Sequence, residues 1–335
     1  MKQLLLFITA FLVINATWNQ TATAQRYEHF SAGFQLGTCH YQGDLDDDGF
    51  EIWQAGGSNP IQQQLFKPAF GFQLNYHFNP YMYARLAFNQ GWMGAADSLN
   101  TDLARRWRNL HFKSAISEFT LQFVLELRAN NDYFRYRKSW TPYIFAGVSL
   151  FHFNPMADAT PEWLSYTYGN RARLFPPNSD GYELQPMGTE GQNFPQALRE
   201  KYGLNEPYAL TQFAIPLGIG VRIRLSRYID LRIDASLRKT FTDYLDDVSG
   251  PHYVNPQELL TYANGNQRAF LFADRSGYAN FGEGRPKSFS AETEVAFWGA
   301  YRLRNPDGTP AEIRGNPKDK DMYGFINVGI TRILK

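Results

Sequence analysis

The sequence predicts an all-β fold: an eight-stranded antiparallel transmembrane β-barrel with long extracellular loops. Three observations lead to this prediction. Aromatic residues make up 16% of the 335 residues although the mean hydropathy is negative, which suits strands with one apolar and one polar face. Apolar and polar residues alternate with a period of two in successive segments. The connections between these segments are alternately short and long.

The clearest alternating segment is 211–225. Its odd-numbered positions from 213 onward carry Phe, Ile, Leu or Val, and its even-numbered positions carry Gln, Ala, Pro, Gly or Arg. Segment 228–241 repeats the pattern with charged residues at even positions. A membrane barrel turns the apolar face to lipid and the charged face into the lumen. A soluble sandwich or lipocalin-like barrel is the alternative, but charges such as Arg85 and Glu118 on the inward face disfavour an apolar pocket.

Six further segments complete the set of eight. Most alternate clearly, 81–92 is noisier, and 142–153 is apolar on both faces. Each has about ten residues or more, the length that a tilted strand needs to cross the hydrocarbon. An even number of strands allows closure, which pairs every backbone polar group. The segments are 27–41, 69–78, 81–92, 112–128, 142–153 and 322–333.

The connections predict how the barrel is oriented. Barrels of the bacterial outer membrane have short periplasmic turns and longer external loops. The sequence therefore predicts four external loops and periplasmic N- and C-termini. The short connections are 79–80, 226–228 and the somewhat longer 129–139, and the long ones are 42–66, 93–111, 154–210 and 241–321.

Residues 1–24 have the features of a secretory signal peptide, which leaves 25–335 as the barrel domain. A lysine near the start precedes an apolar run of about 11 residues, and Ala22-Thr23-Ala24 is a cleavage pattern. The run is shorter than the roughly 20 residues that span a bilayer. We therefore expect export to the Gram-negative outer membrane, with outer-membrane lipid and lipopolysaccharide as partners.

Bulk properties exclude several classes of function. A formal net charge of +1 gives no electrostatic argument for a nucleic-acid partner. The single cysteine, Cys39, cannot form an intrachain disulfide and is interpreted as a small strand side chain. No zinc-protease, nucleophile-elbow or phosphate-loop motif occurs. We therefore expect no cofactor and no enzymatic activity. A lipid-modifying enzyme is kept as a third hypothesis, behind the two given at the end of this section.

The short turn at 226–228 predicts a register. Directly paired residues share a face, and both flanking strands place odd-numbered apolar residues outward, so paired numbers sum to an even value. The tightest solution pairs Leu225 with Ile229. Lumen charges then face one another in a network, with Glu118 or Glu126 as additional acids. The predicted lumen charge network is Arg222, Arg224, Asp230, Arg232 and Asp234.

Two acidic stretches suggest possible metal ligands. Asp44, Asp46 and Asp48 match the opening of a calcium-binding loop. The twelfth position of that loop is Ala55 instead of glutamate, so a solvated acidic loop is preferred and calcium is a weak candidate. A second acidic cluster is interpreted in the same way, as a loop that leaves a strand end. Its members are Asp243, Asp246 and Asp247.

Several short motifs follow one another in order along the chain. They occupy 41–45, 67–71, 108–112, 142–147, 151–155 and 242–250. This series resembles the outer-membrane barrel family that includes PorG, a component of the type IX secretion system, and the resemblance spans roughly 27–335. It implies an outer-membrane barrel that associates with a periplasmic lipoprotein ring. The motif residues are Tyr41, Gly43, Asp44, Leu45, Asp243, Tyr244, Leu245, Asp246, Asp247 and Gly250.

The leading hypothesis for function is therefore a structural component or accessory of a protein secretion machine. The alternative is a free-standing surface barrel whose long loops bind an external ligand or partner. An open pore is not expected, because the lumen of an eight-stranded barrel is just wide enough to be filled by side chains.

Overall fold

A computed structural model describes the predicted strands and parts of the connections between them. The predicted signal peptide and its cleavage site lie outside the described residues. The described residues are 30–45, 67–97, 108–129, 137–159, 178–250, 253–254, 256–262, 269–273, 275 and 314–334.

Nine strands within these residues form one antiparallel sheet. Most have alternating exposed and buried side chains, as the period-two pattern requires. The strands are β1 (Phe30–Gln42), β2 (Pro68–Asn79), β3 (Met82–Ala96), β4 (His111–Glu126), β5 (Trp140–Ala159), β6 (Asn178–Glu183), β7 (Thr211–Arg224), β8 (Ile229–Thr240) and β9 (Met322–Ile333).

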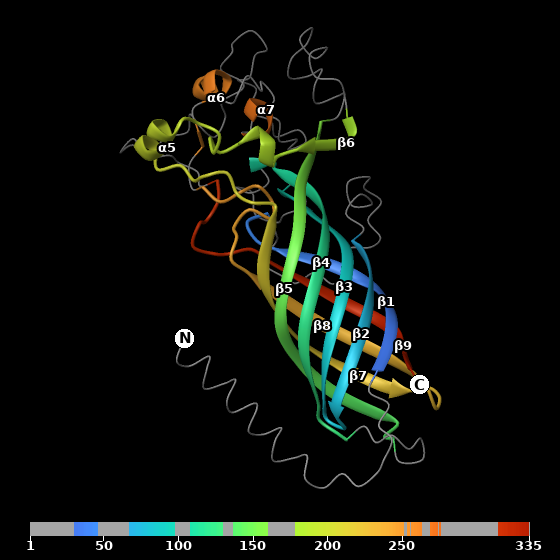
Figure 1. The fold of residues 1–335 in the computed structure, drawn as a ribbon. Coiled ribbons are helices and arrows are strands. Elements are labelled where there is room, and N and C mark those ends of the chain that lie inside the picture. The colour runs from blue at the N-terminus through green and yellow to red at the C-terminus, as the bar shows by residue number, and fades with distance from the viewer. Residues whose placement is uncertain are drawn as a thin grey trace, which may run out of the picture.

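Eight of these strands close into a barrel. Their order is β4-β3-β2-β1-β9-β8-β7-β5, and β4 also pairs with β5, so the sheet returns to its start. Figure 1 shows the tilted strands wrapped around one axis. The closed ladder leaves no strand edge facing lipid, which is the condition for crossing a membrane with strands. The predicted eight-stranded antiparallel barrel is confirmed.

The short strand β6 lies outside the barrel wall. It pairs with the far end of β5, where Met156 lies opposite Glu183, and Figure 1 places it above the upper rim. The sequence analysis did not predict it. Its segment lies inside the long connection 154–210 and has no alternating apolar residues, so the pairing is set by the extension of β5 and not by a local pattern.

Strand β5 resolves the ambiguity of the segment that is apolar on both faces. Ile144 and Val148 are exposed on the outside, whereas Tyr143 and Phe145 are buried in the lumen. The inward rings face the guanidinium group of Arg85, at 5.5 Å and 5.1 Å from its central carbon to the ring centroids. The inner face is therefore aromatic because it packs against cations.

The outer wall of the barrel is apolar. Phe213, Ile219 and Phe119 are 67%, 64% and 62% exposed, while the lumen-facing positions between such residues are buried. A water-soluble protein rarely exposes a continuous apolar band of this kind. The arrangement is that of a transmembrane barrel, with apolar side chains toward lipid and polar ones inside.

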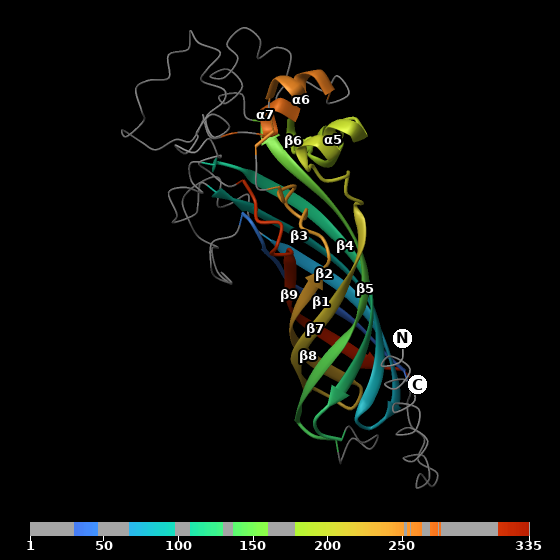
Figure 2. The same cartoon turned by 90° about the vertical axis from the view of Figure 1, so that its left-hand side faces the viewer.

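The two ends of the barrel differ, and we call them the turn end and the loop end. The turn end holds the short connections, the start of β1 and the end of β9 (Figure 1). The loop end carries the remaining elements, which Figure 2 shows gathered above the strands. None of the described helices is long and apolar enough to cross a membrane. These elements are η4 (Gln185–Met187), α5 (Gln196–Tyr202), α6 (Pro256–Tyr262) and α7 (Ala269–Ala273).

Candidate functional site

The β7–β8 turn has the predicted register. Arg224 lies opposite Asp230 and Arg222 opposite Arg232, and the amide of Leu225 donates a 3.0 Å hydrogen bond to the carbonyl of Ile229. The five predicted lumen residues therefore come from one pair of adjacent strands. The ion pairs they form, however, reach other strands of the barrel.

Arg222 is neutralised across the lumen by a residue of β4. Its Nε and one terminal nitrogen donate to the two carboxylate oxygens of Glu126 at 3.0 Å and 3.1 Å, and the same terminal nitrogen donates to the Thr141 hydroxyl at 2.9 Å. Both partners of the ion pair are fully buried. This bidentate geometry compensates for the Arg232 that lies opposite.

Arg232 is held by hydroxyls and aromatic rings. It donates to the hydroxyls of Tyr83 and Thr331, and its guanidinium carbon lies 5.1 Å and 5.6 Å from the ring centroids of Tyr83 and Tyr143. The pattern of β8 did not reveal these partners, because they come from β3, β5 and β9. Cation–π contacts are strongest when, as here, the cation is desolvated.

The main partner of Asp230 differs from the prediction. Arg137, which precedes β5, donates to its carboxylate, while Arg222 approaches at 3.8 Å. Arg224 donates to the backbone carbonyl of Arg137. The turn 129–139 therefore places a cation in the lumen at the turn end. Sequence reasoning missed Arg137 because it treated this segment only as a connection.

Asp234 belongs to a second layer of the lumen. It accepts a hydrogen bond from the Tyr143 hydroxyl and forms a 3.5 Å ion pair with Arg85. Gly220 faces Tyr143 directly, and a Cβ at this glycine would lie 2.4 Å from the tyrosine ring. The glycine on β7 is therefore the space into which the aromatic side chain fits.

A third layer lies nearer the loop end. Arg238 makes a bidentate ion pair with Glu118, with both distances at 2.9 Å. The same carboxylate accepts hydrogen bonds from Asn89 at 2.9 Å and Tyr323 at 2.8 Å. Glu118 and Glu126, expected as additional acids, thus serve different layers. Together the three layers fill the lumen with paired charges.

Above these layers, residues of the loops close the mouth, and we call this region the loop cap. Tyr41, at the end of β1, donates from its hydroxyl to Asp246 at 2.7 Å and to Asp321 at 3.2 Å. The amide of Leu245 donates to the other oxygen of Asp321 at 2.8 Å. A Cβ at Gly43 would lie 2.0 Å from Asp321, so only glycine fits beside this contact.

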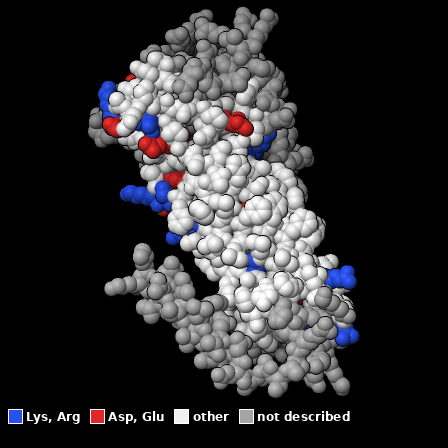
Figure 3. Space-filling model, in the orientation of Figure 1, with Lys and Arg blue, Asp and Glu red and all other residues white. Residues whose placement is uncertain are grey.

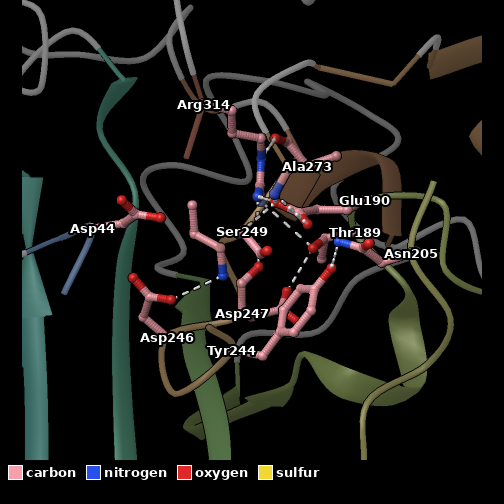
Figure 4. A network of polar contacts seen from close by, with 12 residues as sticks. Asp44, Thr189, Glu190, Asn205, Tyr244, Asp246, Asp247, Ser249, Ala273 and Arg314 are labelled. Carbon is pink, nitrogen blue, oxygen red and sulfur yellow. Dashed lines mark hydrogen bonds and ion pairs between the residues drawn. The ribbon is translucent and has the colours of Figure 1, made fainter. Parts of the chain in front are cut away.

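The neighbouring motif residues join a second cluster in the cap (Figure 4). Asp247 has a positive φ of 67° and accepts hydrogen bonds from Thr189 and Tyr208. The carboxylate of Glu190 accepts bonds from the amides of Ser249 and Gly250 at 2.9–3.0 Å. The backbone of 244–250 is thus wrapped around carboxylates and hydroxyls.

Two arginines connect all four long loops at the loop end. Arg108 forms a bidentate ion pair with Asp97, with both distances at 2.7 Å, and donates to the backbone carbonyls of Asp44 and Arg314. Arg314 in turn pairs with Glu190. Each loop therefore contributes to one buried polar cluster. The motif at 108–112 included Arg108, but its sequence gave no indication of this role.

Burial changes the acidity of the cap. It raises the pKa of Asp243 to about 6 and that of Asp247 to about 7. Burial, together with a neighbouring carboxylate, also raises the pKa values of Asp246 and Asp321 well above their usual range. The hydrogen bond donated by the Tyr41 hydroxyl acts in the opposite direction, because it stabilises the ionised carboxylate and so lowers the pKa of Asp246.

The second acidic cluster lies in a loop that leaves the end of β8, as expected, but this loop is buried and not solvated. Asp243, Asp246 and Asp247 are each 2% exposed or less, because the surrounding loops cover them. Of the weak calcium candidates, Asp44 accepts the backbone amide of Asn316 at 3.1 Å, whereas Asp46 and Asp48 lie outside the described residues. No metal-binding group of three or more side chains occurs among the described residues.

A cavity of about 10 Å³ lies between Asp246, Asp247 and Arg314, which is room for about one water molecule. Chemically, this arrangement is suited to holding loops in place and to exchanging protons.

Comparisons with known proteins add the following. No family model and no curated protein matches the chain. Solved structures that are similar include neisserial surface protein A, at 6% identity, 91% of this chain, 97% of that chain and a TM-score of 0.36. The attachment invasion locus protein Ail of Yersinia pestis matches at 9% identity over 91% of this chain and 98% of that chain, with a TM-score of 0.32. OprG of Pseudomonas aeruginosa matches at 11% identity over 63% of this chain and 77% of that chain, with a TM-score of 0.30.

TM-scores this low carry no argument about family or function. The fold assignment rests on the closed strand order, the apolar exterior and the charged interior. The chain forms a barrel of the outer-membrane type.

Proposed function

We propose that this protein is a structural barrel of the Gram-negative outer membrane, with its turn end in the periplasm and its loop cap outside. Short turns at one end and long loops at the other support this orientation. The apolar exterior, represented by Phe213 and Ile219, supports contact with membrane lipid. Cell fractionation and external protease treatment test both points: the cap should be cleaved on intact cells and the turn end should be protected.

The observation that carries a structural role is the filled lumen. Three layers of buried ion pairs, centred on Glu126, Asp234 and Glu118, cross it between β4 or β3 and β7 or β8. A diffusion pore needs an open aqueous path, and an eight-stranded barrel with such side chains has none. The barrel therefore acts through its surfaces, as a scaffold in the membrane.

We further propose that it is a component or accessory of a protein secretion machine, of the type IX kind to which PorG belongs. The motif residues of that resemblance support this proposal because they converge. Tyr41, from the first motif, contacts Asp246, from the last, and Arg108 contacts Asp44. Motifs scattered along the chain thus form one structural unit, as expected for a fold shared with that family.

Affinity purification from solubilised outer membranes tests this role. A tagged barrel should co-purify with periplasmic lipoproteins of the secretion ring, and deletion of its gene should reduce secretion of type IX cargo. Another tagged outer-membrane barrel from the same cells, purified in parallel, is the control. Recovery of the barrel without ring lipoproteins, with secretion unchanged, would contradict the proposal.

The second candidate is a free-standing surface barrel that binds an external ligand or partner through its loops. The build of the cap favours it: α6 lies at the top of the described part of the cap and α5 at its side (Figure 2), and Tyr202 of α5 and Tyr262 of α6 are 42% and 38% exposed. Under this alternative, removal of the cap by protease on intact cells should abolish a surface-binding activity. Secretion should then be unaffected by deletion of the gene.

We propose no enzymatic activity for the barrel. One Ser–His pair lies within hydrogen-bond distance, with Ser31 Oγ 3.3 Å from His77 Nε2. Both side chains face the lumen and are 3% and 6% exposed, so this pair is not placed to reach a lipid on the outer wall. Incubation of purified barrel with radiolabelled phospholipid and lipopolysaccharide should release no acyl chain, and release that needs His77 would overturn this point.

A further inference from the structure

Four exposed cations lie at the turn end of the barrel. Arg128 follows β4, Lys138 precedes β5, Arg227 lies in the β7–β8 turn, and Arg332 belongs to β9. The strands β4, β5, β7, β8 and β9 are consecutive neighbours in the barrel wall. The four side chains therefore follow one side of the rim, and we call them the basic arc. Blue side chains project at the lower end of the molecule in Figure 3.

The charge of the basic arc is not neutralised by the protein in the part that the structure describes. None of its four members forms an ion pair there. The two acidic side chains described near this end, Glu126 and Asp230, are buried in the lumen. They are already paired with Arg222 and Arg137. The arc is therefore a positively charged surface open to an external anion.

The arginines of the arc lie at the level of lipid headgroups. Arg332 continues the outward row of Val328 and Ile330, which are 49% and 54% exposed. The guanidinium carbon of Arg128 lies 3.9 Å from the ring centroid of Trp140, which is 46% exposed. Tryptophan and tyrosine rings prefer the membrane–water interface, so a cation stacked on such a ring is placed beside lipid phosphates.

Arg227 repeats the arrangement at the next turn. Its guanidinium carbon lies 5.2 Å from the ring centroid of Tyr228. Stacking fixes the plane of a guanidinium group, and a fixed plane presents two N–H donors to one phosphate. The pairs at Trp140 and Tyr228 thus provide two preorganised phosphate donors on neighbouring parts of the rim.

The opposite side of the same rim carries aromatic side chains without charge. Phe30, Tyr76, Phe78 and Tyr81, from β1, β2 and the β2–β3 turn, are 38–48% exposed. Such uncharged aromatic rings do not discriminate between phospholipids with different headgroup charges. Among the described residues, the exposed cations of this rim lie on the side formed by β4, β5, β7, β8 and β9. Such a cluster favours lipids with net negative charge over zwitterionic ones.

We propose that the basic arc is a binding site for anionic phospholipids, whose headgroup phosphates are held by Arg128, Arg227 and Arg332. The proposal rests on the orientation given above, which places the arc at the phospholipid leaflet. The contact of Arg128 with the exposed Trp140 ring, and the position of Arg332 in the lipid-facing row of β9, favour lipid over an acidic protein as the occupant. The arc then anchors one side of the barrel in the periplasmic leaflet.

The test measures lipid retained by the full-length barrel. Barrel reconstituted in vesicles of phosphatidylethanolamine with or without phosphatidylglycerol is analysed by native mass spectrometry. Wild type should retain phosphatidylglycerol preferentially. The glutamine variant, in which Arg128, Arg227 and Arg332 are all changed to glutamine, should lose affinity by about fivefold for each arginine removed. The variant in which Lys239, Lys318 and Lys320 are changed to glutamine is the matched control, because these exposed cations lie at the loop end. It should behave as wild type.

Folding of every variant is checked by the gel shift of unheated protein. The variant with Arg128→Lys, Arg227→Lys and Arg332→Lys keeps the charge but loses the planar donors, so its affinity should fall between those of wild type and the glutamine variant. Equal phosphatidylglycerol retention by a folded glutamine variant would overturn the proposal. Binding of soluble polyglutamate by a wild type that shows no lipid preference would also overturn it and assign the arc to an acidic protein. Neither result depends on whether ring lipoproteins co-purify.

Discussion

Tyr41 and Asp246 are separated by 205 positions in the sequence, yet the tyrosine hydroxyl donates a 2.7 Å hydrogen bond to the aspartate carboxylate. This contact joins the end of β1 to the last long loop. The loop cap is thereby attached to the barrel wall through a buried polar bond.

The stability of the cap should fall as the pH rises. Asp247 has a pKa of about 7 in the folded cap against an ordinary value of about 3.9, because it is buried. The folded cap therefore holds a proton that an opened cap releases above about pH 4. This contribution to stability is complete below that pH and is lost as the pH rises toward 7. Asp246 and Asp321 act with the same sign.

Hydrogen exchange of segment 242–250 measures this effect. Exchange, corrected for its intrinsic pH dependence, should reveal easier opening at about pH 8 than at about pH 5. Asp247→Asn, which keeps the shape without the ionisation, should flatten the pH profile. Opening that becomes harder with rising pH would contradict the assignment of a proton to this carboxylate.

Arg108→Ala should loosen all four long loops of the loop cap. The change leaves the fully buried Asp97 without its cation and removes the bonds to Asp44 and Arg314. Loss of one partner of a buried pair costs about 3–5 kcal/mol. Limited proteolysis in detergent should cleave the loops of this variant faster while the barrel strands stay intact.

Arg199→Ala is the control for this experiment. Arg199 pairs at 3.6 Å with Glu206, which is 85% exposed, and a surface ion pair contributes about 0–1 kcal/mol. Proteolysis of the control should match that of wild type. Equal protection in Arg108→Ala would show that the arginine does not hold the loops together.

Asp230→Ala should weaken the barrel itself. The change leaves the buried Arg137 without its carboxylate partner, and it removes the second carboxylate near Arg222, whose main partner is Glu126. Loss of one partner of a buried ion pair lowers the free energy of unfolding by about 3–5 kcal/mol. The temperature at which the folded gel band disappears should fall. Asp319→Ala is a suitable control because Asp319 is exposed. Asp246→Ala is not, because Asp246 is buried in the cap.

Planar bilayers should show no large, steady conductance for the wild-type barrel. The paired side chains around Glu118, Asp234 and Glu126 fill the lumen at three levels, and loss of one layer leaves the other two closed. The double variant Glu118→Ala with Arg238→Ala should therefore conduct no better than wild type. Steady porin-like channels from wild-type protein would show that the lumen opens in the membrane.

Local pattern alone determined the wall of the barrel. A strand exposed to lipid on one side and to a polar lumen on the other must alternate, so residues 211–225 and 228–241 show their faces directly in the sequence. The three-residue turn between them then left one tight register, which placed Arg224 opposite Asp230 as observed. Strand ends were less well determined, since β3 and β5 continue beyond the alternating segments.

Only the tertiary structure decided the partners of the charged residues. The odd or even position of a residue along its strand assigns its side chain to the lumen, but it does not say which strand faces that side chain across the barrel. The pairing of Arg222 with Glu126 could therefore not be chosen over a pairing with Asp230 or Asp234. The burial of Asp246 could likewise not be predicted from the sequence, because the loops that cover it have no repeating pattern of apolar residues. Acidic residues in a long connection look solvated in sequence, and they become a buried cluster only when four loops fold over one mouth.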